Sequence, residues 1–189
     1  LIVFFGLMTI ADKTSRSCPF YVNYNSNDFR NGDLILFSDN MAIQSLFLTP
    51  TSHIGLVCGN GKEIIDINSK RNVKRRFIEK KLRFNDNYDI SVRRINKEIP
   101  NDVLEKFISM SKNVKYRPPH ELWLRFKNIS DEHHERAFCS TFVMRALVFS
   151  GIFSPDCCNV LPKFFDQNNL KTINGYAYSS AMPIKVECL

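Results

Sequence analysis

The sequence predicts a single-domain α+β fold in which an antiparallel sheet packs against helices. Two observations predict this class. Strand-like segments come first, between residues 33 and 95, and the helix-like segments come after residue 100. Neither an internal repeat nor a regular alternation of strand and helix is visible, which disfavours parallel βαβ units. With 189 residues, of which 44% are hydrophobic, the chain can bury a core without disulfides.

The N-terminal segment is expected to differ from the rest of the chain. Residues 1–11 form an apolar run that ends at Asp12, and as a helix they would span roughly 16 Å, too little for a hydrocarbon core of about 30 Å. We interpret residues 1–22 as a signal or anchor remnant, with a buried strand or helix as the alternative. The first interpretation implies a secreted or membrane-associated protein and the second a cytoplasmic one. Residues 23–189 are expected to form the one domain.

Four strands are predicted from short apolar runs. Residues 33–37 follow a turn, residues 52–58 and 63–68 are separated by an Asn-Gly pair, and residues 88–95 come last. An Asn-Gly pair between two strand-like runs is the strongest short-range signal for a β-hairpin. The middle two runs are therefore expected to pair as a hairpin.

A two-residue turn at the Asn-Gly pair fixes the register of this hairpin. Gly59 then pairs with Lys62, which places Asn68 directly opposite His53 and makes Asp66 a diagonal neighbour of His53 on the same sheet face. A three-residue turn would reverse the parity and separate these side chains. The register thus decides whether His53 has a carboxylate beside it.

The predicted helices lie in the second half of the chain. They span residues 100–112, 121–127 and 137–148, and a last short helix spans 161–168. The apolar positions expected to be buried in the first of them are Val103, Phe107, Ile108 and Met110. The third helix is expected to stop at Ser150-Gly151, since glycine readily adopts the left-handed conformation that ends helices.

One of the six cysteines stands out by its position. Cys139 falls in the first turn of the helix at 137–148, where free N–H groups and the helix dipole favour a thiolate. It is the only cysteine that the pattern puts at a helix start. The alternative is a small buried hydrophobic residue, which is the commoner fate of a free cysteine.

A nucleophilic thiol needs a base, and the base needs an orienting group. His53 is the preferred base because it lies within an apolar strand and the hairpin register brings Asp66 close to it. His133 and His134 are weaker candidates because their surroundings, residues 130–136, are wholly polar. Zinc spacings such as CxxC or HExxH are absent, so neither a metal nor another cofactor is expected.

Four motifs together carry a family resemblance: GDLILF at 32–37, SHIGLV at 52–57, IID at 64–66 and FCSTFVMRAL at 138–147. In this order they resemble the circularly permuted papain-like group of the NlpC-type cysteine peptidase superfamily, with its YiiX/YaeF-like members and a poxvirus virion protein family. In that group the hairpin that carries the histidine precedes the helix that carries the cysteine. The resemblance covers roughly residues 30–170.

This resemblance implies a permuted papain-like fold with a Cys–His–polar triad. Carried over by position, Cys139 is the nucleophile, His53 the base and Asp66 the orienting residue. Further residues are expected to line the substrate or oxyanion site: Tyr116, Ser140 and Asn68. The choice of Asp66 agrees with the hairpin register, which was derived from the turn alone.

The implied activity is cleavage of an amide bond in a peptide or peptide-like substrate by a thiol hydrolase. A lipid esterase or acyltransferase of the same fold is one alternative, although the Asn-Cys-Glu-His motif of the lecithin retinol acyltransferase relatives is absent at Cys139. A second alternative is a non-catalytic binding or structural protein. In that case the virion would be a further possible location of the protein.

The stretch Lys70–Arg83 has eight basic residues against the single acid Glu79. Such a stretch is most often a solvated face, and we expect it to be a basic connection between strands. Its functional alternative is attraction to an anionic membrane surface. Nucleic acid is not an expected partner, because the sequence contains no recognised nucleic-acid-binding motif.

Overall fold

The computed structural model describes most of the chain from residue 29 to residue 184. The described residues are 29–38, 44, 48–68, 71–83, 89–117, 136–157 and 160–184. The expectations for the N-terminal segment 1–22, the helix at 121–127 and residues His133 and His134 lie outside them. Among the helices that are described, none is both long and apolar enough to cross a membrane.

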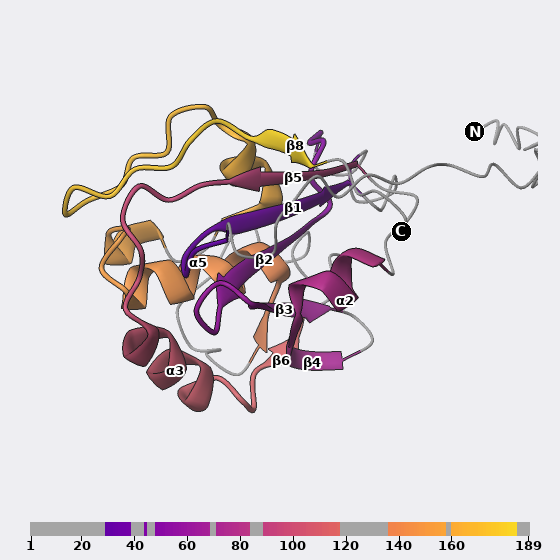
Figure 1. Ribbon diagram of the computed structural model, residues 1–189, viewed down its shortest axis with the longest axis vertical. Coiled ribbons are helices and arrows are strands. Elements are labelled where there is room, and N and C mark those ends of the chain that lie inside the picture. Colours follow the sequence, from indigo (N-terminus) through magenta and orange to yellow (C-terminus); the bar gives the residue numbers. More distant parts are fainter. Residues whose placement is uncertain are drawn as a thin grey trace, which may run out of the picture.

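A six-stranded antiparallel sheet forms the centre of the molecule (Figure 1). Its strands, in spatial order, are β4 (Arg71–Phe77), β3 (Glu63–Asn68), β2 (His53–Cys58), β1 (Leu34–Ser38), β5 (Asp89–Arg93) and β8 (Met182–Ile184). The strands expected at 33–37, 52–58, 63–68 and 88–95 are all present, and each agrees within two residues at both ends.

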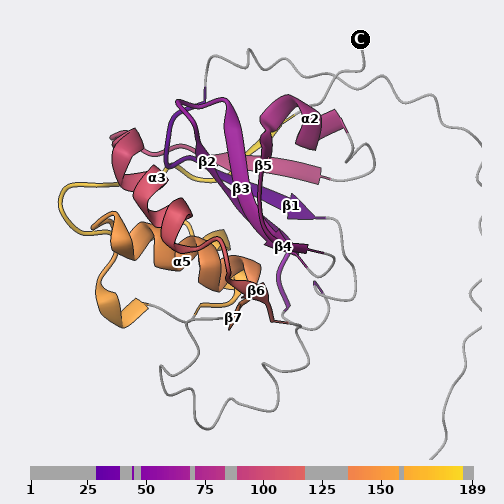
Figure 2. The same cartoon turned by 90° about the horizontal axis from the view of Figure 1, so that it is seen from below.

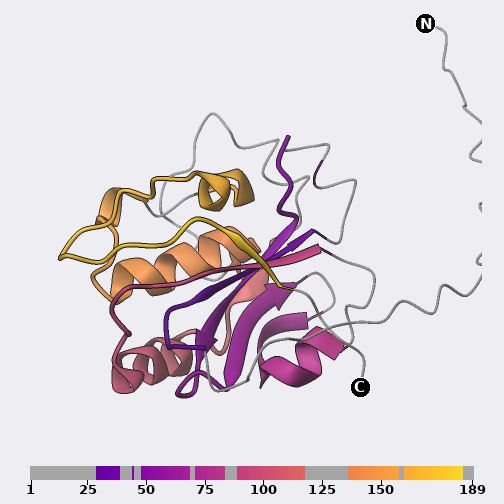
Figure 3. The ribbon, with the colours of Figure 1, turned by 45° about the horizontal axis from the view of Figure 1, so that its top comes forward.

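Helices cover both faces of the sheet (Figures 2 and 3). The elements of one face are α3 (Asn101–Met110) and α5 (Cys139–Phe149), and α2 (Ile78–Arg83) packs on the other. The shorter elements are a parallel pair, β6 (Lys115–Tyr116) and β7 (Arg136–Ala137), and the 3₁₀ helices η2 (Pro155–Cys157) and η3 (Pro162–Asp166). The mixed architecture, with an antiparallel sheet packed against helices, agrees with the predicted class.

The central strands are apolar on both faces, which explains their nearly continuous hydrophobic sequences. Side chains alternate between the faces with a period of two residues. The face under α5 buries Leu34, Leu36, Ile54, Leu56, Ile65 and Ile67. The face under α2 buries Ile35, Phe37, Val57 and Ile64 together with Ile78 and Leu82. A polar residue on either face is therefore unusual and calls for a partner.

The hairpin of β2 and β3 has the predicted register next to its turn. Leu56 pairs with Ile65 and Cys58 with Glu63, as a two-residue turn requires. Asn60 and Gly61 adopt φ values of 56° and 78°. Two consecutive positive φ values are the signature of the type I′ turn that suits the twist of a hairpin.

Farther from the turn, the expected pairing is wrong. The ladder between β2 and β3 ends at Leu56, so Asn68 is not paired with His53. β2 instead stays paired with β1 as far as His53, and β3 stays paired with β4, with an irregularity between Ile67 and Asn68. Here β2 is hydrogen-bonded to β1 alone and β3 to β4 alone. The His53 and Asp66 side chains therefore meet where β2 and β3 are no longer hydrogen-bonded to each other.

Three further expectations need correction. Within the basic stretch Lys70–Arg83, the described residues 71–83 are not a connection, because they form strand β4 and helix α2. Its apolar residues Ile78 and Leu82 pack under the sheet and stabilise the helix. In α3, Met110 is 68% exposed rather than buried, since the helix ends there. The last predicted helix is only the five-residue turn η3, which begins at Pro162.

Candidate active site

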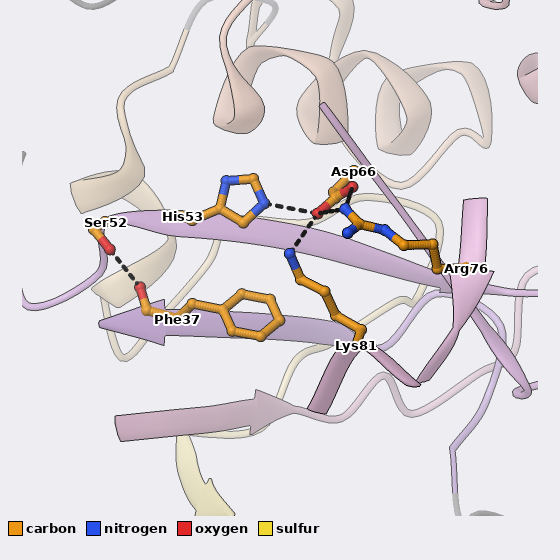
Figure 4. A network of polar contacts seen from close by, with 6 residues as sticks. All are labelled: Phe37, Ser52, His53, Asp66, Arg76 and Lys81. Atoms are coloured by element: carbon orange, nitrogen blue, oxygen red, sulfur yellow. Dashed lines mark hydrogen bonds and ion pairs between the residues drawn. The ribbon is translucent and has the colours of Figure 1, made fainter. Parts of the chain in front are cut away.

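His53 and Asp66 are in direct contact. His53 Nε2 lies 2.9 Å from Asp66 Oδ2 (Figure 4). The His53 side chain begins β2 and is 12% exposed, whereas the Asp66 side chain lies within β3 and is fully buried. Two polar residues that the alternation puts on one apolar face thus satisfy each other, as buried polar groups must.

Cys139 is the first residue of α5, as expected from the sequence. The residue before it, Phe138, is extended and has no side-chain group that could cap the helix. The first N–H groups of a helix lack intrahelical partners, so they face the space around Cys139. α5 also ends where predicted, with Gly151 at φ 70° and its N–H donated to the Val148 carbonyl.

Cys139 is among the groups that raise the pKa of His53, as is Asp66. His53 thus interacts with both Cys139 and Asp66. Burial alone would lower the pKa of His53, but the hydrogen bonds with Asp66 and Cys139, and the charges of both, outweigh it and raise the pKa to about 9. At neutral pH the imidazole is thus favoured as a cation.

Two basic side chains also contact Asp66 (Figure 4). A nitrogen of the Arg76 guanidinium lies 2.8 Å from Oδ1, and Lys81 Nζ lies 2.9 Å from Oδ2. Burial would raise the pKa of Asp66, but the hydrogen bond from His53 and the charges of His53, Lys81 and Arg76 hold it well below its usual range. Asp66 is therefore a permanent anion that three donors share.

The sequence did not indicate Arg76 or Lys81 as parts of a site. Both belong to the basic stretch, which resembles a solvated face as a string of letters. Their positions in the strand and helix patterns could have indicated a buried partner. Arg76 alternates with Arg75 along β4, and Lys81 lies beside the apolar Leu82 of α2, where its ammonium group also sits 4.9 Å from the Phe37 ring centre. A cation next to a buried apolar position needs an anionic or aromatic partner.

Tyr116 lies next to the start of α5. It pairs with Ala137 in the short parallel ladder, and its ring centre is 5.9 Å from that of Phe138. Burial, and then the charge of Cys139, raise the pKa of Tyr116, so its hydroxyl stays protonated. The structure thus brings Tyr116 towards Cys139.

The remaining two predicted site residues are placed differently. The Ser140 hydroxyl is buried and donates to the Val160 carbonyl at 2.6 Å. Asn68 lies at the far end of β3 and pairs with Arg71. The hydrogen bond of Ser140 thus goes to Val160, and the strand pairing of Asn68 is with Arg71; neither contact involves His53.

The other described thiols contrast with Cys139. Cys58 is fully buried under the α5 face, opposite to His53 as the register predicts, and burial raises its pKa to about 12. Cys157 lies half-buried in η2, and both are free thiols. No group of three or more His, Cys, Asp or Glu residues that could hold a metal occurs among the described residues.

Comparisons with known proteins give a structural similarity without a sequence match. No family model and no curated protein matches this sequence. The structure is similar to the crystal structure of YiiX from Escherichia coli O157:H7, which is described as a metalloprotein. The similarity covers 85% of this chain and 98% of YiiX at 15% sequence identity, with a TM-score of 0.49. The chemistry of the site must therefore be argued from this chain's own side chains.

Proposed function

We propose that this protein is a thiol hydrolase that cleaves an amide bond of a peptide or peptide-like substrate. The observation that carries the proposal is the position of His53, which interacts with Cys139 and lies 2.9 Å from the buried carboxylate of Asp66. A nucleophile, a base and an orienting anion in this sequence of contacts are the parts that acyl transfer needs. We propose these three residues as the catalytic triad.

In the proposed reaction, Cys139 and His53 form an ion pair in which His53 holds the proton of the thiol, and the sulfur attacks the carbonyl carbon of the amide. A carbon–sulfur bond forms while the carbonyl electrons move onto the oxygen. The carbon–nitrogen bond then breaks, and His53 gives its proton to the leaving amine. A water molecule, deprotonated by His53, releases the acyl group as a carboxylic acid and restores the thiol.

Asp66 would hold the imidazole in place during both proton transfers. Its contact with Nε2 leaves the other ring nitrogen, Nδ1, to face the thiol, so the tautomer is set from the Asp66 side. The transition-state oxyanion would be stabilised by the N–H groups at the start of α5. The Tyr116 hydroxyl, which stays protonated, is our proposed second donor.

Alkylation of the thiols by iodoacetamide tests the proposed activation of Cys139. Because Cys139 is only 1% exposed, the shape of the pH profile is more informative than the absolute rate. Mass spectrometry of tryptic peptides would give a rate for each cysteine between pH 5 and 10. We expect Cys139 to react well below pH 8 and His53→Ala to shift its profile towards higher pH. Cys58, with its raised pKa, is the internal control. A Cys139 profile unaffected by His53→Ala would contradict the proposal.

A substrate panel separates the amide hydrolase from its alternative, a lipid esterase or acyltransferase. The two arms would be a peptide-amide library and phospholipid vesicles with acyl-ester probes, each compared with Cys139→Ala. Turnover of amides that Cys139→Ala abolishes supports the proposal. Turnover of lipid esters alone supports the alternative, and a protein inert in both arms with an unreactive Cys139 would be a binding or structural protein.

Ion pairs within the stretch Lys70–Arg83 reduce the number of positive charges that could attract an anionic membrane. Arg75 lies 2.7 Å from Glu105 and also pairs with Glu63, and Lys81 is held by Asp66. These charges are partly neutralised within the molecule. An attraction to anionic lipids would then depend on exposed bases such as Lys80.

A further inference from the structure

The segment Val160–Asp166 contacts the chain on both sides of the candidate site. At its end, the Asp166 carboxylate accepts hydrogen bonds from two hydroxyls, with Thr49 on Oδ2 and Thr51 on Oδ1. Both threonines are nearly fully buried, and the Thr51 N–H also donates to the Thr49 hydroxyl at 3.2 Å. Thr51 is only two residues before His53, so this end fixes the chain where β2 begins.

The residue between Thr51 and His53 continues the same anchoring. Both the N–H and the hydroxyl of Ser52 donate to the Phe37 carbonyl at 2.9 Å (Figure 4). Phe37 pairs with His53 across the strands, and its ring centre is 5.7 Å from that of His53. Thr51 and Ser52, which precede His53, and Phe37, which pairs with it, are thus held in place at the start of β2.

The beginning of the segment reaches the other side of the site. The Val160 carbonyl accepts the hydrogen bond from Ser140 at 2.6 Å, and Ser140 follows Cys139 directly in α5. Ser140 itself is fully buried. The predicted oxyanion or substrate residue therefore has a bond that ties the helix start to Val160–Asp166.

Between these two ends the segment is stiffened by a proline and is held by the buried side chain of Arg93. Pro162 lies in the first turn of η3, and Phe165 is fully buried. Arg93 of β5 is also fully buried and donates to the carbonyls of Phe165, Gln167, Asn168 and Ser179, at 2.5–3.2 Å. Its positive charge interacts favourably with Asp166. A single guanidinium thus fixes the main chain around Asp166.

We propose that Val160–Asp166 is a brace that sets the distance between Cys139 and His53, and that Asp166 is a positioning residue for the reaction. This inference rests on the proposed function, because it concerns the same thiol and imidazole. A carboxylate suits position 166 because each of its oxygens accepts one hydroxyl. Asparagine has a single acceptor oxygen, so it could keep a bond to the second threonine only if that hydroxyl turned round to accept from the amide N–H.

Substitutions at Asp166 and Thr51 test the brace. We expect Asp166→Asn and Thr51→Val each to slow Cys139 alkylation at pH 6.5 by about tenfold and to move its pH profile towards that of His53→Ala. Thr51→Ser keeps the hydroxyl and should restore the wild-type profile. The control is Asp156→Asn, because Asp156 is an exposed aspartate in the neighbouring η2 whose carboxylate accepts a hydrogen bond from the Ser154 hydroxyl.

The double variant Asp166→Asn/Thr51→Val completes the design. If the two groups act through one brace, its profile should shift no further than that of the larger single variant. Unchanged profiles in folded Asp166→Asn and Thr51→Val proteins, as judged by circular dichroism, would overturn the brace. Should Asp166→Asn fail to fold, the comparison of Thr51→Val with Thr51→Ser decides alone, and equal profiles would overturn the brace.

Failure of the brace and failure of the proposed function give different results. If wild-type Cys139 reacts with a pH profile that already matches His53→Ala, the proposed function fails, and the brace fails with it. If the wild-type profile depends on His53 but not on residues 51 and 166, only the brace fails. NMR titration of His53 in the same variants gives a second measure of whether its contact with Cys139 has changed.

Discussion

Lys81 Nζ lies 2.9 Å from Asp66 Oδ2, the same oxygen that His53 Nε2 contacts. The orienting anion of the candidate triad is therefore shared with a permanent cation. Arg76 adds a second cation, which contacts both oxygens of the carboxylate. The electrostatic support that Asp66 gives to a protonated His53 is thus smaller than that of an unshared carboxylate. The cluster of these four residues carries net positive charge even when His53 is neutral, and protonation of His53 increases it.

Replacement of Lys81 by methionine should raise the pKa of His53 above its value of about 9. A cation next to Asp66 disfavours the imidazolium, so its removal strengthens the pairing of His53 with Asp66. We expect a rise of about one pKa unit, which corresponds to about 1.4 kcal/mol. The measurement is NMR titration of the His53 ring protons. Lys80→Met, at an exposed position on the same helix, should leave the pKa of His53 unchanged. A lower pKa of His53 in the Lys81→Met protein would refute the sharing of Asp66.

The contact of His53 with Asp66 should make stability depend on pH. The pKa of His53 is raised from 6.5 to about 9, so the stabilisation is fully present below pH 6.5 and is lost as the pH rises through 9. The pKa of Asp66 is lowered, so its contribution is present above the ordinary value of 3.8 and is lost as the pH falls below it. The pair therefore stabilises the fold most between about pH 4 and 6.5.

Asp66→Asn should remove most of this dependence on alkaline pH. Between pH 6.5 and 9 we expect the free energy of unfolding of the wild type to fall by roughly 2–3 kcal/mol more than that of the variant. Urea denaturation at several pH values measures the difference. Asp102→Asn, at an exposed site in the first turn of α3, is the matched control and should behave as the wild type does. Parallel curves for the wild type and Asp66→Asn would show that the two groups are not coupled.

Tyr116→Phe should lower kcat of the proposed amide hydrolysis by roughly 10²-fold and leave KM nearly unchanged. The expectation follows from a protonated hydroxyl beside the start of α5, which would act only on the oxyanion of the transition state. Steady-state kinetics on an amide substrate found in the panel measures both constants. Tyr176→Phe is the control for loss of a half-buried hydroxyl elsewhere. An increase in KM at constant kcat would make Tyr116 a binding residue instead.

The contact between His53 and Asp66 and the place of Cys139 at a helix start were predictable because local rules fix them. The Asn-Gly turn determines the parity of the hairpin, and parity puts His53 and Asp66 on one face. The apolar run that starts at Ala137 and the stop at Gly151 place Cys139 at a helix start. Each of these steps depends on residues fewer than fifteen positions apart, where turn and helix geometry leave few alternatives.

The partners that depend on distant chain segments were not predictable. Asp166 binds Thr49 across 117 sequence positions, and nothing local in either segment indicates the other. Lys81 reaches Asp66 only because α2 folds back beneath β3, while a run of bases in the sequence suggests exposure to solvent. Pairing of β2 with β3 also ended sooner than the turn implied, since each strand kept its other neighbour. Competition between neighbouring strands is a tertiary effect that a hairpin rule does not contain.

The hairpin turn gives a last prediction, which concerns how firmly the register is held. Gly61 has φ 78°, and a Cβ atom there would lie 2.0 Å from the Phe29 carbonyl oxygen. Phe29 is itself buried in the core, so the main chain cannot move away freely. Gly61→Ala should therefore destabilise the fold by about 2–4 kcal/mol, which combines left-handed strain with a backbone clash.

Gly175→Ala separates these two causes. Gly175 has φ 73° but open space around the added Cβ, so its replacement should cost only about 1 kcal/mol through strain. Urea denaturation of both variants gives the difference, which is the cost of the clash with Phe29. Because Asn60-Gly61 sets the parity that joins His53 to Asp66, Gly61→Ala should also weaken the dependence of Cys139 alkylation on His53, whereas Gly175→Ala should not. Equal losses of stability in the two variants would mean that the turn yields, and that the register is held by the strands rather than by the turn.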